Sequence, residues 1–291
     1  MAAKKHQVHL PALSQLQIEK AVQAALLEDL GLAGDVTSDA TIPASAKAVA
    51  HMNSREDGVI SGMALAKSAF IQFDRKTKFK SYVKDGERVK PGQKIAKIEG
   101  RARSVLGGER VALNYLCHLS GIASYTSIFA QRIAHTKAVV CCTRKTIPGL
   151  RAFEKYAVKC GGGSNHRYGL DDAILIKDNH IAVAGGVREA IESARAFAGH
   201  LIKIEVEVDT LEQLKEALKA EPDVVMLDNM GPDELKQGVE IVAGLIPIEA
   251  SGNVNIDTIK DIAECGVDMI STSKITMSAP TLDIGLDIHI D

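Results

Sequence analysis

The sequence predicts an α/β protein whose second half forms an open, incomplete β/α barrel. After His135, six short apolar runs are separated by helical patterns, which is typical of βαβ units around a parallel sheet. Polar or charged residues follow each apolar run. A closed barrel of this type needs eight strands, and the helical stretch before Lys137 does not supply the missing ones. An open barrel therefore fits better than a closed one.

The composition is typical of a soluble globular protein. Hydrophobic residues make up 46% of the chain and charged residues 25%, with a formal net charge of −2. The length of 291 residues allows one large domain or two smaller ones. The five cysteines show no CxxC spacing, which favours reduced thiols. The N-terminal residues MAAKKHQVHLPALSQ lack the apolar segment of a signal peptide, and no apolar run is long enough to cross a membrane. We therefore expect a cytoplasmic protein.

The first half is predicted to contain short strands between helices. A helix begins after Ser14, a favoured N-cap residue, and ends near Gly31. The polar, glycine-rich segment GLAGDVTSDATIP is expected to be a loop. Strands are predicted at AKAVAHMNS, DGVISG, KFKSYVKDG and QKIAKIEG, with a helix over Met63–Phe73. Two helical segments are expected between Arg103 and Ala134, broken near Ser120-Gly121.

The second half is predicted to repeat strand and helix. The strands are KAVVCC, DAILIK, LIKIEVEV, DVVML, IPIEA and VDMI. The intervening helices are expected near residues 149–159, 187–198, 211–220, 232–243 and 256–265. The final segment, TLDIGLDIHID, alternates like one further strand, which we expect to return to the N-terminal sheet.

The stretch Cys141–His180 concentrates cationic side chains around glycine-rich turns. It contains Arg144, Lys145, Arg151, His166, Arg167 and Lys177, beside Pro148-Gly149 and Gly161-Gly162-Gly163. Cations on such turns can converge on one compact anion. A nucleic-acid surface more often interleaves aromatic residues, which make up only 4% of this chain. We therefore predict a small, multiply charged substrate that carries phosphates or carboxylates.

Polar residues follow the predicted strands, where the active site of a β/α barrel is built. In chain order they are Thr143-Arg144-Lys145, Lys177-Asp178-Asn179-His180, Glu205 with Glu207, Asp228-Asn229, Ser251-Gly252-Asn253 and Ser271-Thr272-Ser273. Because the strand interiors read as apolar, we expect these groups to share one site.

Each group suits a different part of an anionic substrate. The Ser-Gly-Asn and Ser-Thr-Ser turns can offer N–H and hydroxyl groups to a phosphate. Arg144, Arg167 and Lys145 can bind carboxylates or phosphates. Glu207 and Asp228 can hold Mg²⁺ or sugar hydroxyls. Glu205 lies two positions before Glu207 on the same strand face, so that one of the two glutamates could be enough.

Lys177 permits two interpretations that the spacing does not separate. It could form a Schiff base, as in aldolase barrels, or serve as a point charge for a phosphate. His166 and His180 show no metal-ligand spacing with any Cys or His, so that a zinc site is not predicted.

Eight motifs occur in an order that points to a known family. GDVTSDATIP and GERVALNYL lie in the first half; TRKTIPGLRAFEKYAV, GGGSNHRYGLDDAILIKDNH, EVEVDTLEQL, VVMLDNM, IEASGNVN and SAPTLDIGLDI follow in the second. Together they resemble the quinolinate phosphoribosyltransferase family, also called carboxylating nicotinate-nucleotide pyrophosphorylases. The resemblance covers nearly the whole chain, and several motifs in the right order make it specific.

The resemblance implies two domains and a reaction. An N-terminal α/β sandwich domain would cover residues 1–125, joined by a C-terminal strand at 280–291, and the open β/α barrel would cover residues 126–279. The enzyme would convert quinolinate and phosphoribosyl pyrophosphate to nicotinate mononucleotide, pyrophosphate and CO₂, with Mg²⁺. It would act in NAD biosynthesis as a homodimer, in which one subunit's N-terminal domain covers the other's barrel.

The resemblance also assigns residues. Catalytic roles would fall to Lys145, Lys177, Glu207 and Asp228, with Glu207 and Asp228 also facing the ribose and the metal. The substrate-binding residues would be Arg110, Thr143, Arg144, His166, Arg167, Lys177, Ser251, Gly252, Asn253, Ser271 and Ser273. Arg144, His166 and Arg167 would hold the quinolinate carboxylates, and Ser251-Gly252 the 5′-phosphate. Arg110, in GERVALN, would reach in from the partner subunit.

The chain departs from the family pattern at one place. After VDMIS the family usually has a glycine and then a small residue, whereas this chain has Thr272-Ser273-Lys274. A side chain where glycine lets the backbone approach a phosphate would obstruct that contact, and Lys274 would supply an added cation.

Three alternatives remain at this point. A related phosphoribosyltransferase could act on another small heterocycle, and a monoacid substrate would not need both Arg144 and Arg167. A Schiff-base aldolase would rely on Lys177. A phosphate-binding module would bind phosphoribosyl pyrophosphate without turnover.

Overall fold

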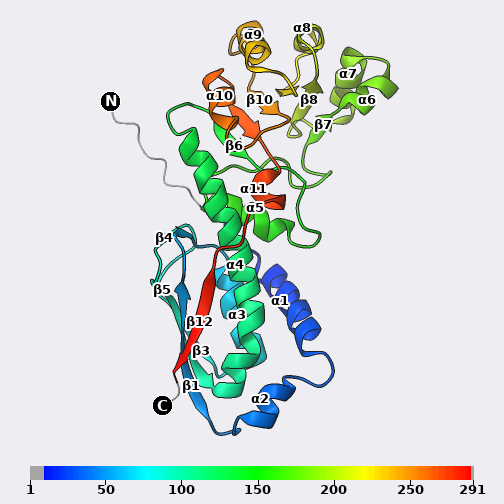
Figure 1. The fold of residues 1–291 in the computed structure, drawn as a ribbon. Helices are drawn as coiled ribbons and strands as arrows, with labels where there is room; N and C mark the ends of the chain where they lie inside the picture. Colours follow the sequence, from blue (N-terminus) through cyan, green and yellow to red (C-terminus); the bar gives the residue numbers. More distant parts are fainter. Residues whose placement is uncertain (1–9, 290–291) are drawn as a thin grey trace. The chain divides into compact units, whose positions relative to one another are not determined.

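A computed structural model describes residues 10–289 as two compact units (Figure 1). Of the described residues, the N-terminal unit contains 10–127, Ala152–Gly162 and 279–289, and the barrel unit contains Ile128–Arg151 and Gly163–Ser278. Two terminal segments lie outside the described residues. They are residues 1–9, on which part of the N-terminal prediction rests, and residues 290–291 of the expected last strand.

The N-terminal unit is built on a four-stranded antiparallel sheet in the order β12-β1-β5-β3. Its strands are β1 (Lys47–Ser54), β3 (Lys78–Ser81), β5 (Lys94–Arg101) and β12 (Ile284–His289). A separate pair is formed by β2 (Gly58–Val59) and β4 (Arg88–Val89). Every second residue of β1 is buried, because alternate side chains of a strand point to opposite faces. One face of the sheet therefore contributes to the core.

Helices supply the rest of this core. They are α1 (Gln15–Leu30), α3 (Met63–Phe73), α4 (Ala102–Arg132) and, from the later segment, α5 (Arg151–Cys160). Met52, Phe70, Ile98 and Leu116 are fully buried between sheet and helices. The predicted helix Met63–Phe73 is confirmed at both ends.

Two predictions for the first half were wrong. The expected loop contains helix α2 (Val36–Thr41), because the Asp35 carboxylate accepts the Ser38 N–H at 3.0 Å and caps it. The expected break near Ser120-Gly121 is absent, since α4 runs through both residues. Gly121 is a packing residue there: a Cβ on it would lie 2.1 Å from the Pro280 carbonyl oxygen.

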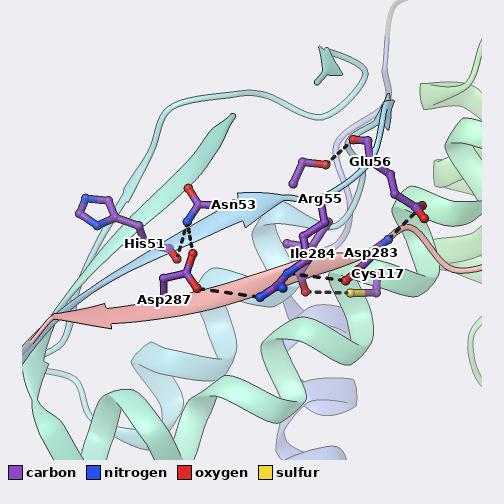
Figure 2. Close-up of polar contacts among 9 residues, drawn as sticks. His51, Asn53, Arg55, Glu56, Cys117, Asp283, Ile284 and Asp287 are labelled. Carbon is purple, nitrogen blue, oxygen red and sulfur yellow. Dashed lines mark hydrogen bonds and ion pairs between the residues drawn. The ribbon is translucent and has the colours of Figure 1, made fainter. Parts of the chain in front are cut away.

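The last strand is attached to β1 by side chains as well as by its ladder (Figure 2). The Asn53 amide donates to Asp287 at 2.7 Å, and the Arg55 guanidinium lies 4.0 Å from Asp283 and 3.9 Å from Asp287. The Cys117 thiol of α4 donates to the Ile284 carbonyl at 3.7 Å. Strand β12 is thus held on its edge by contacts to both the sheet and a helix.

The barrel unit contains a six-stranded parallel sheet in the order β6-β11-β10-β9-β8-β7. Its strands are β6 (Val139–Cys141), β7 (Ile174–Ile176), β8 (Ile204–Val208), β9 (Val224–Asp228), β10 (Ile248–Ser251) and β11 (Met269–Ser271). The six predicted strands and their parallel arrangement are confirmed. Strands β6 and β7 are the two edges of this sheet, as an open barrel requires.

Helices follow the strands of this unit in turn (Figure 1). They are α6 (Asp178–Ala184), α7 (Val187–Phe197), α8 (Leu211–Lys219), α9 (Pro232–Val242), α10 (Ile259–Glu264) and α11 (Lys274–Met277). Local sequence explains where they begin: the Thr210 hydroxyl accepts the Gln213 N–H at the start of α8, and Pro232 occupies the first turn of α9. The short helices α6 and α11 were not predicted. Among the described residues, no helix is both long and apolar enough to cross a membrane.

Candidate active site

A cavity of about 890 Å³ lies at the carboxyl ends of the parallel strands. It is lined by Thr143, Arg144, Lys145, His166, Arg167, Leu175, Lys177, Glu207, Met226, Asp228, Asn229, Ser251, Gly252, Asn253, Val254, Asn255, Ser271, Thr272, Ser273 and Lys274. The site residues that the family resemblance assigns are among them, except Arg110. Four residues that we also expected at the shared site do not line the cavity, namely Asp178, Asn179, His180 and Glu205. Arg110 is exposed on α4 and belongs to the N-terminal unit.

Strand register explains why these residues meet. In a parallel sheet, neighbours in register point to the same face. Glu207 is in register with Met226, and Met226 with Glu249, while Asp228 is in register with Ser251. Alternation along each strand therefore brings polar residues of three adjacent strands to one face, which is the face lined by the cavity.

Arginines form one wall of the cavity. Arg144 and Arg167 each have a buried Nε without a hydrogen-bond partner within the described part of the chain. Burial, and secondarily the positive charge of Arg144, lowers the pKa of Arg167. Two neighbouring cations with unused buried donors form a site that favours an anion.

Arg151 belongs to the predicted cationic stretch but has a different place. Its guanidinium donates to the Arg144 carbonyl at 3.2 Å, to the Thr146 hydroxyl at 3.1 Å and to the Tyr168 carbonyl at 3.1 Å. It does not line the cavity. Arg151 instead connects the two loops that carry Arg144 and Arg167.

Carboxylates form another part of the lining. Glu207 is nearly buried, and its Oε2 lies 2.5 Å from the Lys177 Nζ. On the next strand, Asp228 accepts a hydrogen bond from the Asn229 side chain at 2.6 Å. Both acidic residues face the cavity from adjacent strands. They offer the hard oxygen ligands that Mg²⁺ takes, with room for water and substrate oxygens, so that these residues fit the predicted ion.

The turn after β10 is closely packed around Gly252. Its φ is +91°, and a Cβ would lie 2.2 Å from the Asn229 Oδ1. Asn229 and Asn253 also have left-handed backbones, with φ of 54° and 52°, which asparagine tolerates better than most residues. The backbone of this turn therefore requires glycine, and it stays open toward the cavity.

The corresponding turn after β11 does not require glycine. Ser273 has a φ of −80°, an ordinary value for a residue with a side chain. The Thr272 hydroxyl donates to the Val254 carbonyl at 3.1 Å and accepts the Lys274 N–H at 3.2 Å. The departure from the family pattern thus introduces no backbone strain, and Ser273 and Lys274 line the cavity.

A buried polar layer lies beneath the cavity, and it corrects the expectation that the strand interiors are apolar. Glu205 of β8 and Glu249 of β10 are buried, with side chains 12% and 3% exposed. His166 Nε2 lies 2.9 Å from Glu205 Oε2 and 3.7 Å from Glu249 Oε1. Burial, and then repulsion by Glu205, raises the pKa of Glu249 to about 7.

Sequence reasoning missed Glu249. A signal for it was present: IEVEV and IPIEA both place a glutamate inside a strand, where a lone charge is costly unless it has a partner. Only the register shows that Glu205 and Glu249 meet the same histidine. His166, Glu205 and Glu249 also have the residue types of a metal site, although the sequence predicted none around His166.

The chain matches models for two domains that together span most of it. Residues 35–120 match the quinolinate phosphoribosyl transferase N-terminal domain, and residues 122–287 match the C-terminal domain of the same family.

Individual proteins show the same similarity over nearly the full length. The chain is 41% identical over 278 residues to the probable nicotinate-nucleotide pyrophosphorylase [carboxylating] of Bacillus subtilis (strain 168), covering 96% of each chain. It is 41% identical to the nicotinate-nucleotide pyrophosphorylase [carboxylating] of Mycobacterium leprae (strain TN), covering 92% of this chain and 95% of the relative. The crystal structure of NadC from Streptococcus pyogenes has a TM-score of 0.93 at 40% identity, covering 97% of this chain and 99% of that one.

Proposed function

The chain belongs to the quinolinate phosphoribosyltransferase family, and we propose that it converts quinolinate and phosphoribosyl pyrophosphate to nicotinate mononucleotide, pyrophosphate and CO₂ in NAD biosynthesis. One observation supports this most strongly. A single cavity combines two arginines with unused buried donors, two carboxylates on adjacent strands and two polar turns at strand ends. Such a lining suits a dicarboxylate beside a phosphorylated sugar.

The cationic wall would hold quinolinate. Arg144 and Arg167 can each take a carboxylate in bidentate fashion, and Lys145 adds a third positive charge. A monoacid would leave one arginine facing another cation without a counter-charge. The pair therefore favours a dicarboxylate over its single-acid analogue.

The two turns would hold phosphates. Ser251, Gly252 and Asn253 present backbone and side-chain donors on one side of the cavity, and Ser271 and Ser273 lie on the neighbouring strand end. Thr143 ends the adjacent strand β6. These donors would hold the 5′-phosphate and the pyrophosphate on either side of the ribose.

Bond exchange at the sugar needs charge stabilisation rather than a covalent intermediate. The quinolinate nitrogen forms a bond to ribose C1 as the C1–oxygen bond to pyrophosphate breaks, and positive charge develops on the sugar. Glu207 and Asp228 would stabilise that charge, while Lys145 and Lys177 would neutralise charge on the leaving pyrophosphate. Loss of CO₂ next to the new pyridinium nitrogen leaves an electron pair on carbon, which takes up a proton.

Glu207 and Asp228 would also hold Mg²⁺. Bound there, the ion would offset the negative charge of the pyrophosphate group. We further propose a cytoplasmic homodimer in which the exposed Arg110 of one subunit completes the partner's cavity, because no residue of α4 lines the cavity of this chain.

The test is an assay of CO₂ release and of nucleotide formation, with quinolinate, phosphoribosyl pyrophosphate and Mg²⁺. We expect turnover with quinolinate and none with nicotinate. Turnover with nicotinate would move the substrate to a monoacid heterocycle. Binding of phosphoribosyl pyrophosphate without any turnover would favour a binding module.

A Schiff-base aldolase is disfavoured by the contact between Lys177 and Glu207, since an amine in an ion pair is a poor nucleophile. Borohydride reduction with substrate present should leave Lys177 unlabelled. A reduced adduct on Lys177 would contradict the transferase mechanism.

A further inference from the structure

Lys274 lies at the start of helix α11 and lines the cavity. The turn that carries it is bonded to the loops on both sides. The Thr272 hydroxyl accepts the Lys274 N–H at 3.2 Å and donates to the Val254 carbonyl, 3.1 Å away, in the loop after β10. The Thr276 hydroxyl donates to the Lys145 carbonyl, 2.8 Å away, in the loop after β6. The backbone of Lys274 is therefore held in place between the ends of the two strands that flank β11.

The lysines that line the cavity differ in whether the protein balances their charge. The Lys177 ammonium lies 2.5 Å from the Glu207 carboxylate. Within residues 10–289, neither Lys145 nor Lys274 makes an ion pair with an acidic side chain. Lys274 is also exposed, so that its flexible stem can turn toward a bound molecule. Its charge is available to a ligand rather than committed to the fold.

The neighbours of Lys274 indicate which anion it would meet. The turn Ser251-Gly252-Asn253 follows β10, which pairs with β11, and it lines the same cavity. This is the turn that would hold the 5′-phosphate of the sugar. Its N–H, hydroxyl and amide donors are all neutral, whereas a phosphate monoester carries nearly two negative charges at neutral pH. A cation beside that turn would balance the charge that the turn alone leaves unbalanced.

We propose that the Lys274 ammonium binds the 5′-phosphate of phosphoribosyl pyrophosphate and thereby determines the preference for a phosphorylated sugar. This inference rests on the proposed function for the identity of the sugar phosphate. The two ends of that substrate are then held differently. Lys145, Lys177 and the metal ion offset the charge of the pyrophosphate group, and Lys274 offsets that of the 5′-phosphate without the ion.

The test measures the two ends of the substrate separately. Ribose 5-phosphate carries only the 5′-phosphate, and inorganic pyrophosphate represents only the leaving group. Isothermal titration of each compound into the full-length protein, without Mg²⁺, gives the two affinities. We expect Lys274→Ala to weaken the binding of ribose 5-phosphate about tenfold, because a charge-assisted hydrogen bond is lost. The affinity for pyrophosphate should change less than about twofold.

Two matched variants serve as controls. Lys274→Arg keeps the positive charge at the same place, and its affinity for ribose 5-phosphate should stay within about threefold of wild type. Lys215→Ala removes an equal charge from an exposed position of α8 that does not line the cavity. It should change neither affinity, which separates a local contact from the net charge of the protein.

Steady-state kinetics should give the same pattern with the complete substrates. In Lys274→Ala the KM for phosphoribosyl pyrophosphate should rise about tenfold, and the KM for quinolinate should change less than about twofold. An unchanged affinity of Lys274→Ala for ribose 5-phosphate would overturn the proposal, as would no binding of that compound to wild type. Equal losses for ribose 5-phosphate and pyrophosphate would also overturn it, because they would indicate a general electrostatic effect.

The titrations need no turnover, so that they are independent of the reaction. If Lys274→Ala loses affinity for ribose 5-phosphate alone while wild type does not convert quinolinate, the proposed function fails and the phosphate contact of Lys274 stands.

Discussion

The two units treat buried carboxyl groups in opposite ways. In the N-terminal unit, Asp74 has a side chain only 8% exposed, and it accepts hydrogen bonds from the Lys76 N–H, Arg101 and Ser104. These bonds, that of Lys76 first, lower its pKa to about 2. In the barrel unit, Glu249 is 3% exposed, and burial raises its pKa to about 7.

The difference lies both in burial, which is the main cause of the raised pKa of Glu249, and in the hydrogen bonds, which dominate at Asp74. Asp74 has donors on both oxygens and stays charged, as a carboxylate in a structural role should. Glu249 has an Oε1 without a hydrogen-bond partner among residues 10–289 and lies near a second buried carboxyl group, Glu205. Unsatisfied, perturbed groups concentrate where a protein does chemistry. Substitutions of cavity residues in the barrel unit should therefore alter activity, whereas substitutions in the core of the N-terminal unit should mainly alter stability.

The largest effect is expected from Phe70→Ala in the N-terminal unit. Phe70 is fully buried and packs near Phe79, so that its truncation should destabilise the fold by about 3–5 kcal/mol. Urea unfolding measures the loss, and KM is determined on protein that remains folded. The matched control is Phe197→Ala at a side chain that is 89% exposed, which should cost below about 0.5 kcal/mol. A large rise in the KM for quinolinate in folded Phe70→Ala protein would contradict the interpretation that the N-terminal core affects stability rather than activity.

Glu207→Gln should produce the largest effect on catalysis. It keeps the shape of the side chain but removes the negative charge near the developing charge on the ribose and beside Lys177. We expect kcat to fall about 10²–10³-fold, with thermal stability nearly unchanged. Glu212→Gln, the same change on the exposed first turn of α8, is the control. Equal rates for Glu207→Gln and Glu212→Gln would remove Glu207 from the site.

Glu249→Gln should change how stability depends on pH. The folded protein retains the Glu249 proton up to about pH 7, whereas an unfolded chain releases it near 4.5. Wild-type stability therefore falls as the pH rises from about 4.5 to about 7, and the penalty persists above 7. Glutamine cannot ionise, so that the variant should be more stable than wild type by about 1–3 kcal/mol at pH 8 and equal to it at pH 4.

Asp74→Asn provides the opposite case for the same measurement. The pKa of Asp74 is lowered, so that its contribution to stability is present above its ordinary value of 3.8 and is lost as the pH falls toward 2. The variant should be less stable than wild type at neutral pH, and the gap should close in strong acid. Glu240→Gln on the exposed face of α9 should leave the whole curve unchanged. If the free energy of unfolding of Glu249→Gln and of wild type changed with pH in parallel, the raised pKa of Glu249 would be contradicted.

The smallest effect is expected from Arg144→Lys. Lysine keeps the positive charge but loses the planar pair of donors, including the Nε that is now buried and unused. The KM for quinolinate should rise about tenfold while that for phosphoribosyl pyrophosphate stays the same. Arg188→Lys, at an exposed position of α7, is the control. An equal rise in both KM values would mean that Arg144 contacts the sugar phosphate instead.

The sequence predicted the strands of the barrel better than it predicted helices α2 and α4 in the first half of the chain. Apolar runs with regular spacing predicted all six parallel strands, because burial on both faces leaves a continuous apolar signal. Glycine misled the prediction at α4, where Gly121 serves close packing rather than a break. The short helix α2 was not predicted, because its sequence is polar and its start depends on one capping contact by Asp35.

The sequence predicted those site residues that lie at or just after the ends of strands. Lys177 follows β7 directly, Asp228 ends β9, and Arg144 lies in the loop after β6, so that topology alone brings them together. Glu249 required the pairing of β9 with β10, which no single sequence pattern reveals. The contact between the Arg167 backbone N–H and His166 Nδ1 exists only after the loop has folded, so that no sequence pattern reveals it.

The return of strand β12 to the N-terminal sheet has a consequence for biosynthesis. Strand β1 pairs on one side with β5 and on the other with β12, whose residues follow the whole barrel segment in the chain. The segment Ala152–Gly162 also joins the N-terminal unit late. A nascent chain can therefore not complete its N-terminal sheet until the barrel segment has been synthesised, and until then one edge of β1 lacks its partner. Deletion of β12 alone would leave the barrel sequence intact, yet the N-terminal sheet would lack its edge strand.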